Sequence, residues 1–135
     1  MTAAYLLDTN TVSYYIANQP SQVRRKLESV GDSAIAISAV TEGELRYGVA
    51  RNQGAMRRRA SVESFLADAT IFPWDSDAAQ AYGLLRAEQE RKGRPLSNED
   101  LMIAAHALSR GLILITNDQA FRFVEGLKTE DWTIP

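Results

Sequence analysis

Four acidic residues of this chain have the type and position expected of ligands for a metal ion: Asp8, Glu44, Asp100 and Asp118. Asp8 directly follows the short apolar segment Tyr5–Leu7, and Asp118 comes shortly after the apolar segment Ile113–Ile115. In an open sheet of parallel strands, ligands bind outside the carboxyl ends of the strands. We therefore expect the fold to bring Asp8 and Asp118 together.

Helical phase selects the other two acids from larger acidic clusters. Glu44 lies close to Glu42, and Asp100 lies beside Glu99, in segments with a helical pattern. Successive side chains on a helix are about 100° apart, so neighbouring acids point in different directions. Glu44 and Asp100 share the apolar faces of their segments, whereas Glu42 and Glu99 do not. We predict that Glu44 and Asp100 turn inward.

A cluster of carboxylates needs a partner for its charge. Two unit charges about 4 Å apart repel by roughly 1–4 kcal/mol in water or near a protein surface. Hard divalent cations relieve this repulsion, and a set of oxygen ligands without cysteine or histidine suits Mg²⁺ or Mn²⁺ better than zinc. Such ions lower the pKa of water and stabilise the displacement of a phosphodiester.

The same acids could instead serve as helix caps. Asp8 and Asp118 could each be the N-cap of a following helix, and acidic residues are favoured in first turns. Thr41-x-x-Glu44 and Ser97-x-x-Asp100 also resemble capping boxes. Short patterns of this kind do not distinguish a cap from a ligand.

Short apolar segments between helical patterns predict an α/β fold with a mainly parallel sheet. The expected strands are Tyr5–Leu7, Ala34–Ile37 and Ile113–Ile115, with weaker candidates at Thr70–Phe72 and Trp132–Ile134. The expected helices are Ser38–Arg51, Ala55–Asp68, a segment from about Ala78 to near Gly93, and Asn98–Arg110. Ser97 is the predicted N-cap of the last helix, and Gly111 is its predicted end.

The composition limits the classes of protein that fit. The chain has 135 residues, of which 45% are hydrophobic, and we expect one globular domain spanning 1–135. It has no cysteine, which excludes disulfides and thiolate metal sites and fits a reducing, cytoplasmic location. No apolar run approaches the roughly 18 residues that a membrane span needs. We therefore expect a cytoplasmic protein without a membrane segment.

The net charge of −2 does not exclude a phosphate-bearing substrate. The chain has 17 acidic and 15 basic residues. Setting the four candidate ligands aside leaves 13 acidic residues against the same 15 basic residues. Two bound divalent ions would change the charge of the whole molecule from −2 to +2.

Four motifs in order resemble the signatures of PIN-domain proteins of the VapC type. They are Leu7-Asp8-Thr9-Asn10, Glu44-Leu45-Arg46-Tyr47-Gly48, Asp100-Leu101-Met102-Ile103-Ala104-Ala105-His106-Ala107 and Thr116-Asn117-Asp118. One short motif would be a weak signal, but these four span nearly the whole chain. The resemblance implies a three-layer α/β/α sandwich and a metal-dependent endoribonuclease, the toxin of a type II toxin–antitoxin pair.

The resemblance also assigns roles to individual residues. It places catalytic and metal-binding roles on Asp8, Glu44, Asp100 and Asp118, with Mg²⁺ or Mn²⁺ as the ion. Thr116 and Asn10 match positions that support the carboxylates. The implied partners are an RNA substrate, a second copy of the chain, and a VapB-type antitoxin whose tail enters the acidic pocket. Gln119-Ala120 replaces a pair that often carries an acid, which leaves the number of ions, one or two, open.

Basic residues are candidates for contact with RNA or antitoxin. Arg46 belongs to the second motif and could bind phosphate, or pair with Glu42 or Glu44. Arg57, Arg58 and Arg59 form a cluster, and a second cluster spans Arg91–Arg94. Such clusters are more often solvated helix faces than binding sites.

His106 is the only histidine. It falls on the helix face of Glu99 and Arg110, which we expect to face the solvent. We interpret it as a surface residue rather than a catalytic one.

Two other functions compete with the nuclease. The chain could be a non-catalytic PIN scaffold that binds RNA or a protein, although all four acids are present. A HAD-like phosphatase would need an acid two positions after its nucleophile, where this chain has Asn10. That class also usually has a lysine between its later motifs, and the sequence from Asp100 to Asp118 contains none.

Overall fold

The structure is a computed structural model that describes residues 3–94 and 96–135. Its elements, in chain order, are β1 (Tyr5–Leu7), α1 (Thr9–Ala17), α2 (Ser21–Val30), a 3₁₀ turn (Asp32–Ala34), β2 (Ile35–Ser38), α3 (Ala39–Arg51), α4 (Met56–Asp68), β3 (Ile71–Phe72), α5 (Ser76–Arg91), α6 (Asn98–Arg110), β4 (Ile113–Ile115), a 3₁₀ helix (Gln119–Phe123) and β5 (Thr129–Glu130). Within these described ranges, no helix is both long enough and apolar enough to cross a membrane.

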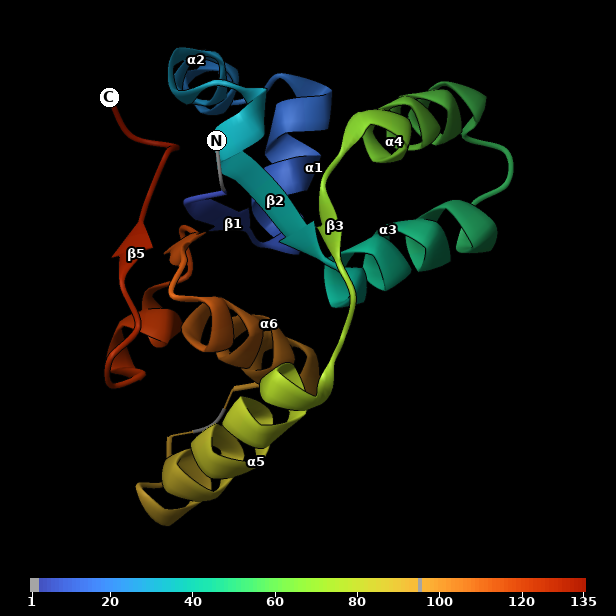
Figure 1. The fold of residues 1–135 in the computed structure, drawn as a ribbon. Coiled ribbons are helices and arrows are strands. Elements are labelled where there is room, and N and C mark those ends of the chain that lie inside the picture. The colour runs from blue at the N-terminus through green and yellow to red at the C-terminus, as the bar shows by residue number, and fades with distance from the viewer. Residues whose placement is uncertain (1–2, 95) are drawn as a thin grey trace.

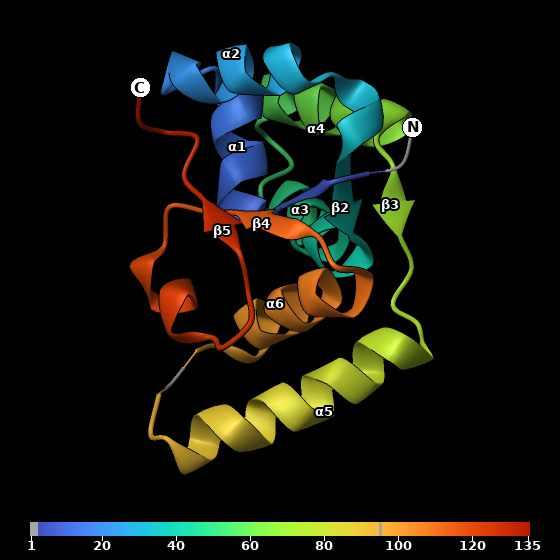
Figure 2. The same ribbon diagram turned by 60° about the vertical axis from the view of Figure 1, so that its left-hand side comes forward.

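The five strands form one parallel sheet in the order β3-β2-β1-β4-β5. Helices α1, α2 and α4 lie on one side of the sheet and α5 and α6 on the other, as Figures 1 and 2 show. Helix α3 contacts α1 and α4 as well as α6. The predicted α/β/α sandwich with a mainly parallel sheet is confirmed.

Alternating side chains of the short strands build a separate core on each face of the sheet. Leu6 of β1 and Leu114 of β4 pack with α5 and α6, whereas Leu7 and Ile115 pack with α1, α2 and α4. Successive residues of a strand point to opposite faces, so strands buried on both sides read as continuous apolar runs. This explains why segments of three or four residues sufficed to predict β1, β2 and β4.

Capping residues fix the helices that position the site. Ser97 caps α6 through a hydrogen bond from the Asp100 N–H to its Oγ (3.1 Å). Gly111 ends the same helix in the left-handed conformation, with φ of 66°. Both predictions at these two positions are confirmed. Ser38 caps α3 in the same way, accepting from the Val40 N–H.

One predicted strand is wrong. Trp132–Ile134 does not pair with the sheet, and the edge strand is instead Thr129–Glu130. Trp132 is buried, donates its indole N–H to Glu130 Oε1 (3.0 Å) and packs edge-on against Tyr5. Its apolar character therefore reflects an anchor beneath the sheet edge rather than a strand.

The strand order creates a switch point between β1 and β4. The chain passes from β1 outward to β2 and β3, and then returns to the other side of β1 to form β4 and β5. The connections after β1 and β4 therefore diverge at the carboxyl ends of these two strands. Open α/β sheets bind ligands in the crevice at such a point.

Candidate active site

The carboxyl ends of β1 and β4 bring Asp8 close to Thr116 and Asp118. Leu7 pairs with Ile115, and the Asp8 N–H donates to the Ile115 carbonyl (3.1 Å). Thr116 Oγ1 accepts from the Asp118 N–H (3.0 Å), and its hydroxyl also hydrogen-bonds to the Asp8 carboxylate. Thr116 is buried and links the two acids, so the strand pairing places both at the switch point.

Helix α3 delivers Glu44 to the start of α1. The Thr9 hydroxyl donates to Glu44 Oε1 (2.5 Å) and lies 3.1 Å from the Thr41 hydroxyl. Thr9 immediately follows Asp8 in the chain, so this bond ties the second motif to the first. Glu44 is half-buried, in agreement with an inward-turned side chain.

Asp100 completes the group from the first turn of α6. It is half-buried, whereas its neighbour Glu99 is exposed. Burial raises the pKa of Asp100, and the negative charges of Asp118, Glu44 and Asp8 raise it further. The structure therefore brings all four predicted acids near one another, from four separate parts of the chain.

The electrostatics of this group favour a cation. Burial raises the pKa of Asp8 despite hydrogen bonds from Thr116 and Thr11, and the charge of Asp118 adds to the rise. Among the ion pairs of the described residues, none joins a lysine or arginine to any of the four acids. Folding with these groups charged costs stability above their ordinary pKa, and a bound cation would offset that cost.

The donor chemistry fits a hard divalent ion, because all four ligands would be carboxylate oxygens. Across residues 3–94 and 96–135, however, no three acidic, histidine or cysteine side chains stand in ready-made coordination geometry. The acids are therefore neighbours rather than a preformed coordination shell.

Asp8 and Asp118 also act as helix caps. Asp8 Oδ1 accepts from the Thr11 N–H (2.8 Å), and Asp118 Oδ1 accepts from the Ala120 N–H (2.9 Å). Each bond uses one carboxylate oxygen, and a carboxylate has a second one, so capping and ion binding are compatible. The capping-box interpretation of Glu44 is wrong, since α3 begins at Ala39 and Glu44 lies within it.

Three threonines to which the sequence analysis gave no supporting role hold the acids in place. Thr9 and Thr41 surround Glu44, and Thr11 donates its backbone N–H to Asp8 and its hydroxyl to the Ile115 carbonyl (3.0 Å). Thr9 belongs to the first motif, and its hydroxyl group was the only feature of the sequence that suggested a contact with an acid. Asn10 is exposed in the first turn of α1, and its supporting role stays a prediction.

None of the candidate basic contacts forms an ion pair with the four acids in the described ranges. Arg46 is about half exposed and pairs with Glu42 (2.9 Å) and Glu63 (3.0 Å), linking α3 to α4. Of the alternatives for Arg46, the structure shows the pair with Glu42. Arg57, Arg58 and Arg59 are exposed in the first turn of α4. Contact of these four arginines with RNA or antitoxin stays a prediction.

Comparison with known proteins identifies the family. The chain matches the PIN domain over residues 5–127. The tRNA(fMet)-specific endonuclease VapC of Shigella flexneri is 42% identical, covering 96% of this chain and 98% of the relative. The protein of that name from Salmonella typhimurium is 39% identical, with 95% and 97% covered. The chain is a VapC-type PIN-domain protein.

Solved structures of VapBC assemblies have the same fold as this PIN domain. The DNA-bound VapBC of Salmonella typhimurium aligns with a TM-score of 0.90 at 38% identity, covering 97% of this chain and 99% of the other. VapBC2 of Rickettsia felis, bound to a DNA fragment from its promoter, aligns with a TM-score of 0.88 at 33% identity, covering 96% and 98%.

One cavity in the described parts of this PIN domain lies away from the acids. It has a volume of about 500 Å³ and lies among α1, α2, α4 and the neighbouring sheet edge. Its lining includes Arg24, Arg57 and Phe65 but none of the four acids.

The prediction that His106 faces the solvent is wrong. His106 is fully buried in the PIN domain, with Nδ1 2.7 Å from Ser38 Oγ and the ring packed against Trp74 and Phe72. Helical phase shows which residues share a face of a helix, but it does not show how many of those faces other parts of the protein cover. Glu99 and Arg110 lie exposed near the two ends of α6, while the segment after β3 covers the middle.

The burial of His106 predicts a pH-dependent stability. Burial and the nearby Arg110 lower its pKa, although Asp75 opposes this. The unfolded chain therefore takes up a proton near pH 6.5 that the folded protein resists, and stability falls as the pH drops below that value. We expect urea midpoints at pH 7.5 and pH 5.5 to differ less in His106→Gln than in the wild type. Equal pH dependence in both proteins would exclude this contribution.

Proposed function

We propose that this chain is the toxin ribonuclease of a toxin–antitoxin pair and cleaves RNA phosphodiester bonds with divalent ions at Asp8, Glu44, Asp100 and Asp118. The observation that carries the proposal is the convergence of these acids at the switch point, without a cationic partner among the described ion pairs. The relatives named tRNA(fMet)-specific endonuclease support RNA as the substrate class.

The carboxylates would hold Mg²⁺ or Mn²⁺, which makes water a stronger acid and stabilises negative charge on phosphate oxygens. The protein contributes position. Thr9 holds Glu44, Thr11 holds Asp8, and Thr116 spans Asp8 and Asp118. Fixing these groups before the substrate arrives reduces the reorganisation needed in the transition state.

Neither a histidine nor a cysteine is available beside the four acids to act as the general base. The only histidine of the chain is buried against Ser38 and Trp74, and the chain has no cysteine. A carboxylate of the site would then be the group that accepts the proton of the attacking water.

The proposed partners follow from the aligned assemblies. VapBC-5 of Mycobacterium tuberculosis, described as a member of the VapBC family of toxin–antitoxin systems, aligns over 96% of this chain at 34% identity with a TM-score of 0.72. We infer that a VapB-type antitoxin binds and inhibits this chain. Formation of a homodimer stays a prediction of the sequence.

Purified protein incubated with total cellular RNA and Mn²⁺ tests the function. We expect a few discrete fragments whose new ends map to a defined site, because a regulated toxin acts on selected RNAs. Addition of the cognate antitoxin should suppress them. Folded, antitoxin-free protein that binds RNA but produces no fragments would instead support the non-catalytic scaffold.

A further inference from the structure

An exposed aromatic side chain with two arginines beside its ring lies in the segment that follows Asp118. Phe123, at the end of the 3₁₀ helix Gln119–Phe123, is 49% exposed. The guanidinium carbons of Arg94 and Arg122 lie 5.3 and 5.6 Å from the centre of its ring. We refer to Arg94, Arg122 and Phe123 as the aromatic–arginine platform.

The platform is joined to two of the four acids by short stretches of chain. Asp118 caps the 3₁₀ helix that ends at Phe123, and Arg94 lies in the connection that leads into α6 and Asp100. Arg94 Nη1 also donates to the Phe123 carbonyl (3.3 Å), which fastens the two stretches together. Figure 2 shows the 3₁₀ helix beside the start of α6.

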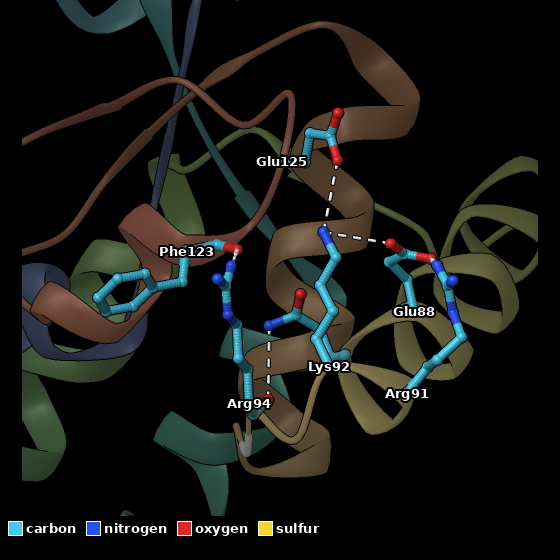
Figure 3. A network of polar contacts seen from close by, with 7 residues as sticks. Glu88, Arg91, Lys92, Arg94, Phe123 and Glu125 are labelled. Carbon is cyan, nitrogen blue, oxygen red and sulfur yellow. Dashed lines mark hydrogen bonds and ion pairs between the residues drawn. The ribbon is translucent and has the colours of Figure 1, made fainter.

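The backbone beneath the platform is anchored in the core, while the Phe123 ring is about half exposed. Phe121 and Val124 on either side are 1% and 2% exposed and belong to the core with α5 and α6. The Phe123 ring is instead about half exposed, and Figure 3 shows Arg94 beside it. A rigid backbone presenting an exposed aromatic ring loses little conformational entropy when a ligand binds.

The charges near the platform separate into paired and unpaired cations. Arg91 pairs with Glu88, and Lys92 pairs with Glu88 (3.1 Å) and Glu125 (3.4 Å), as Figure 3 shows. Among the ion pairs of the described residues, none involves Arg94 or Arg122. Their charges are therefore available to an anionic ligand.

We propose that the aromatic–arginine platform binds single-stranded RNA next to the cleavage site. A base stacks on the Phe123 ring, and Arg94 and Arg122 contact the flanking phosphates. Single-stranded nucleic acid is recognised by this combination of an aromatic ring and nearby arginines. The inference rests on the proposed ribonuclease function and adds to it a subsite for unpaired nucleotides.

Binding without cleavage tests the subsite. The probe is a fluorescein-labelled 12-nucleotide oligoadenylate, measured by anisotropy in EDTA so that RNA remains intact. Stacking of one base is worth about 1–3 kcal/mol, so Phe123→Leu should weaken binding about 5- to 150-fold. Phe123→Tyr keeps the ring and should bind within about twofold of the wild type. Leu84→Ala, at another exposed apolar residue, is the surface control and should bind normally.

Three results would overturn the inference. The first is that Phe123→Leu binds the oligonucleotide as tightly as the wild type. The second is that Phe123→Tyr loses as much affinity for RNA as Phe123→Leu does. The third is that the wild type does not bind the oligonucleotide. Loss of antitoxin affinity in Phe123→Leu, with RNA affinity unchanged, would assign the platform to a protein partner. Failure of the subsite is distinct from failure of the proposed function, because the former leaves wild-type cleavage of cellular RNA intact.

Discussion

Asp100→Asn reduces RNA cleavage by at least about 100-fold on the proposed mechanism, because it removes one negative ligand from the ion site. The substitution preserves size and the first turn of α6, where the Asp100 N–H donates to Ser97 Oγ. It also removes a charge that Asp118, Glu44 and Asp8 repel, so the fold should not weaken. Initial rates on the RNA cut by the wild type, with circular dichroism of both proteins, measure the effect.

Glu99→Gln is the matched control for Asp100→Asn. The two acids are adjacent in the same helical turn and have the same charge, but Glu99 is exposed. We expect Glu99→Gln to cleave RNA at close to the wild-type rate. If both variants lose activity equally, the loss results from a change in the overall surface charge and not from the loss of a specific ligand. If Asp100→Asn remains fully active while folded, the proposed role of Asp100 is wrong.

Removal of divalent ions with EDTA stops cleavage on the same mechanism, and Mn²⁺ or Mg²⁺ added in excess of the chelator restores it. Without the ion, the acids have no cationic partner in the described ion pairs, and two of them have raised pKa values. The phosphate to be cleaved would then face negatively charged acids without an ion, so the chemical step should suffer. Rates at stepped free Mn²⁺ concentrations measure the recovery.

Full activity in EDTA, with metal-free buffers, would contradict ion-dependent chemistry. Metal contamination is controlled by assaying Asp100→Asn in parallel, since that variant should not recover at any Mn²⁺ concentration that restores the wild type. Recovery of both proteins to the same rate would show that the ion acts on the RNA rather than at the carboxylates.

Much of the fold was predictable because local signals agreed with the tertiary structure. The strands β1 and β4 are unbroken apolar runs, and α6 has a capping serine at one end and a glycine at the other. The errors occurred where packing outweighed local pattern. Trp132 is apolar because it anchors a loop, and His106 is buried because the segment after β3 covers α6 from outside.

The positions of the acids were also predictable, because carboxyl ends of parallel strands meet at one edge and helical phase separates neighbouring acids. The supporting contacts were not. The bond from Thr9 to Glu44 joins residues 35 positions apart and depends on how α3 lies against α1. Phe123 gave no signal either, since its sequence neighbours Phe121 and Val124 suggest another core residue.

Calorimetric titration of Mn²⁺ into the metal-free protein tests the central claim most directly, because it detects ion binding at the acids without RNA or antitoxin. The wild type and Glu99→Gln should bind the ion with the same affinity, and Asp100→Asn should bind at least about tenfold more weakly because a ligand is lost. Binding of equal strength in all three proteins, or none in the wild type, would contradict a metal site built from these four carboxylates.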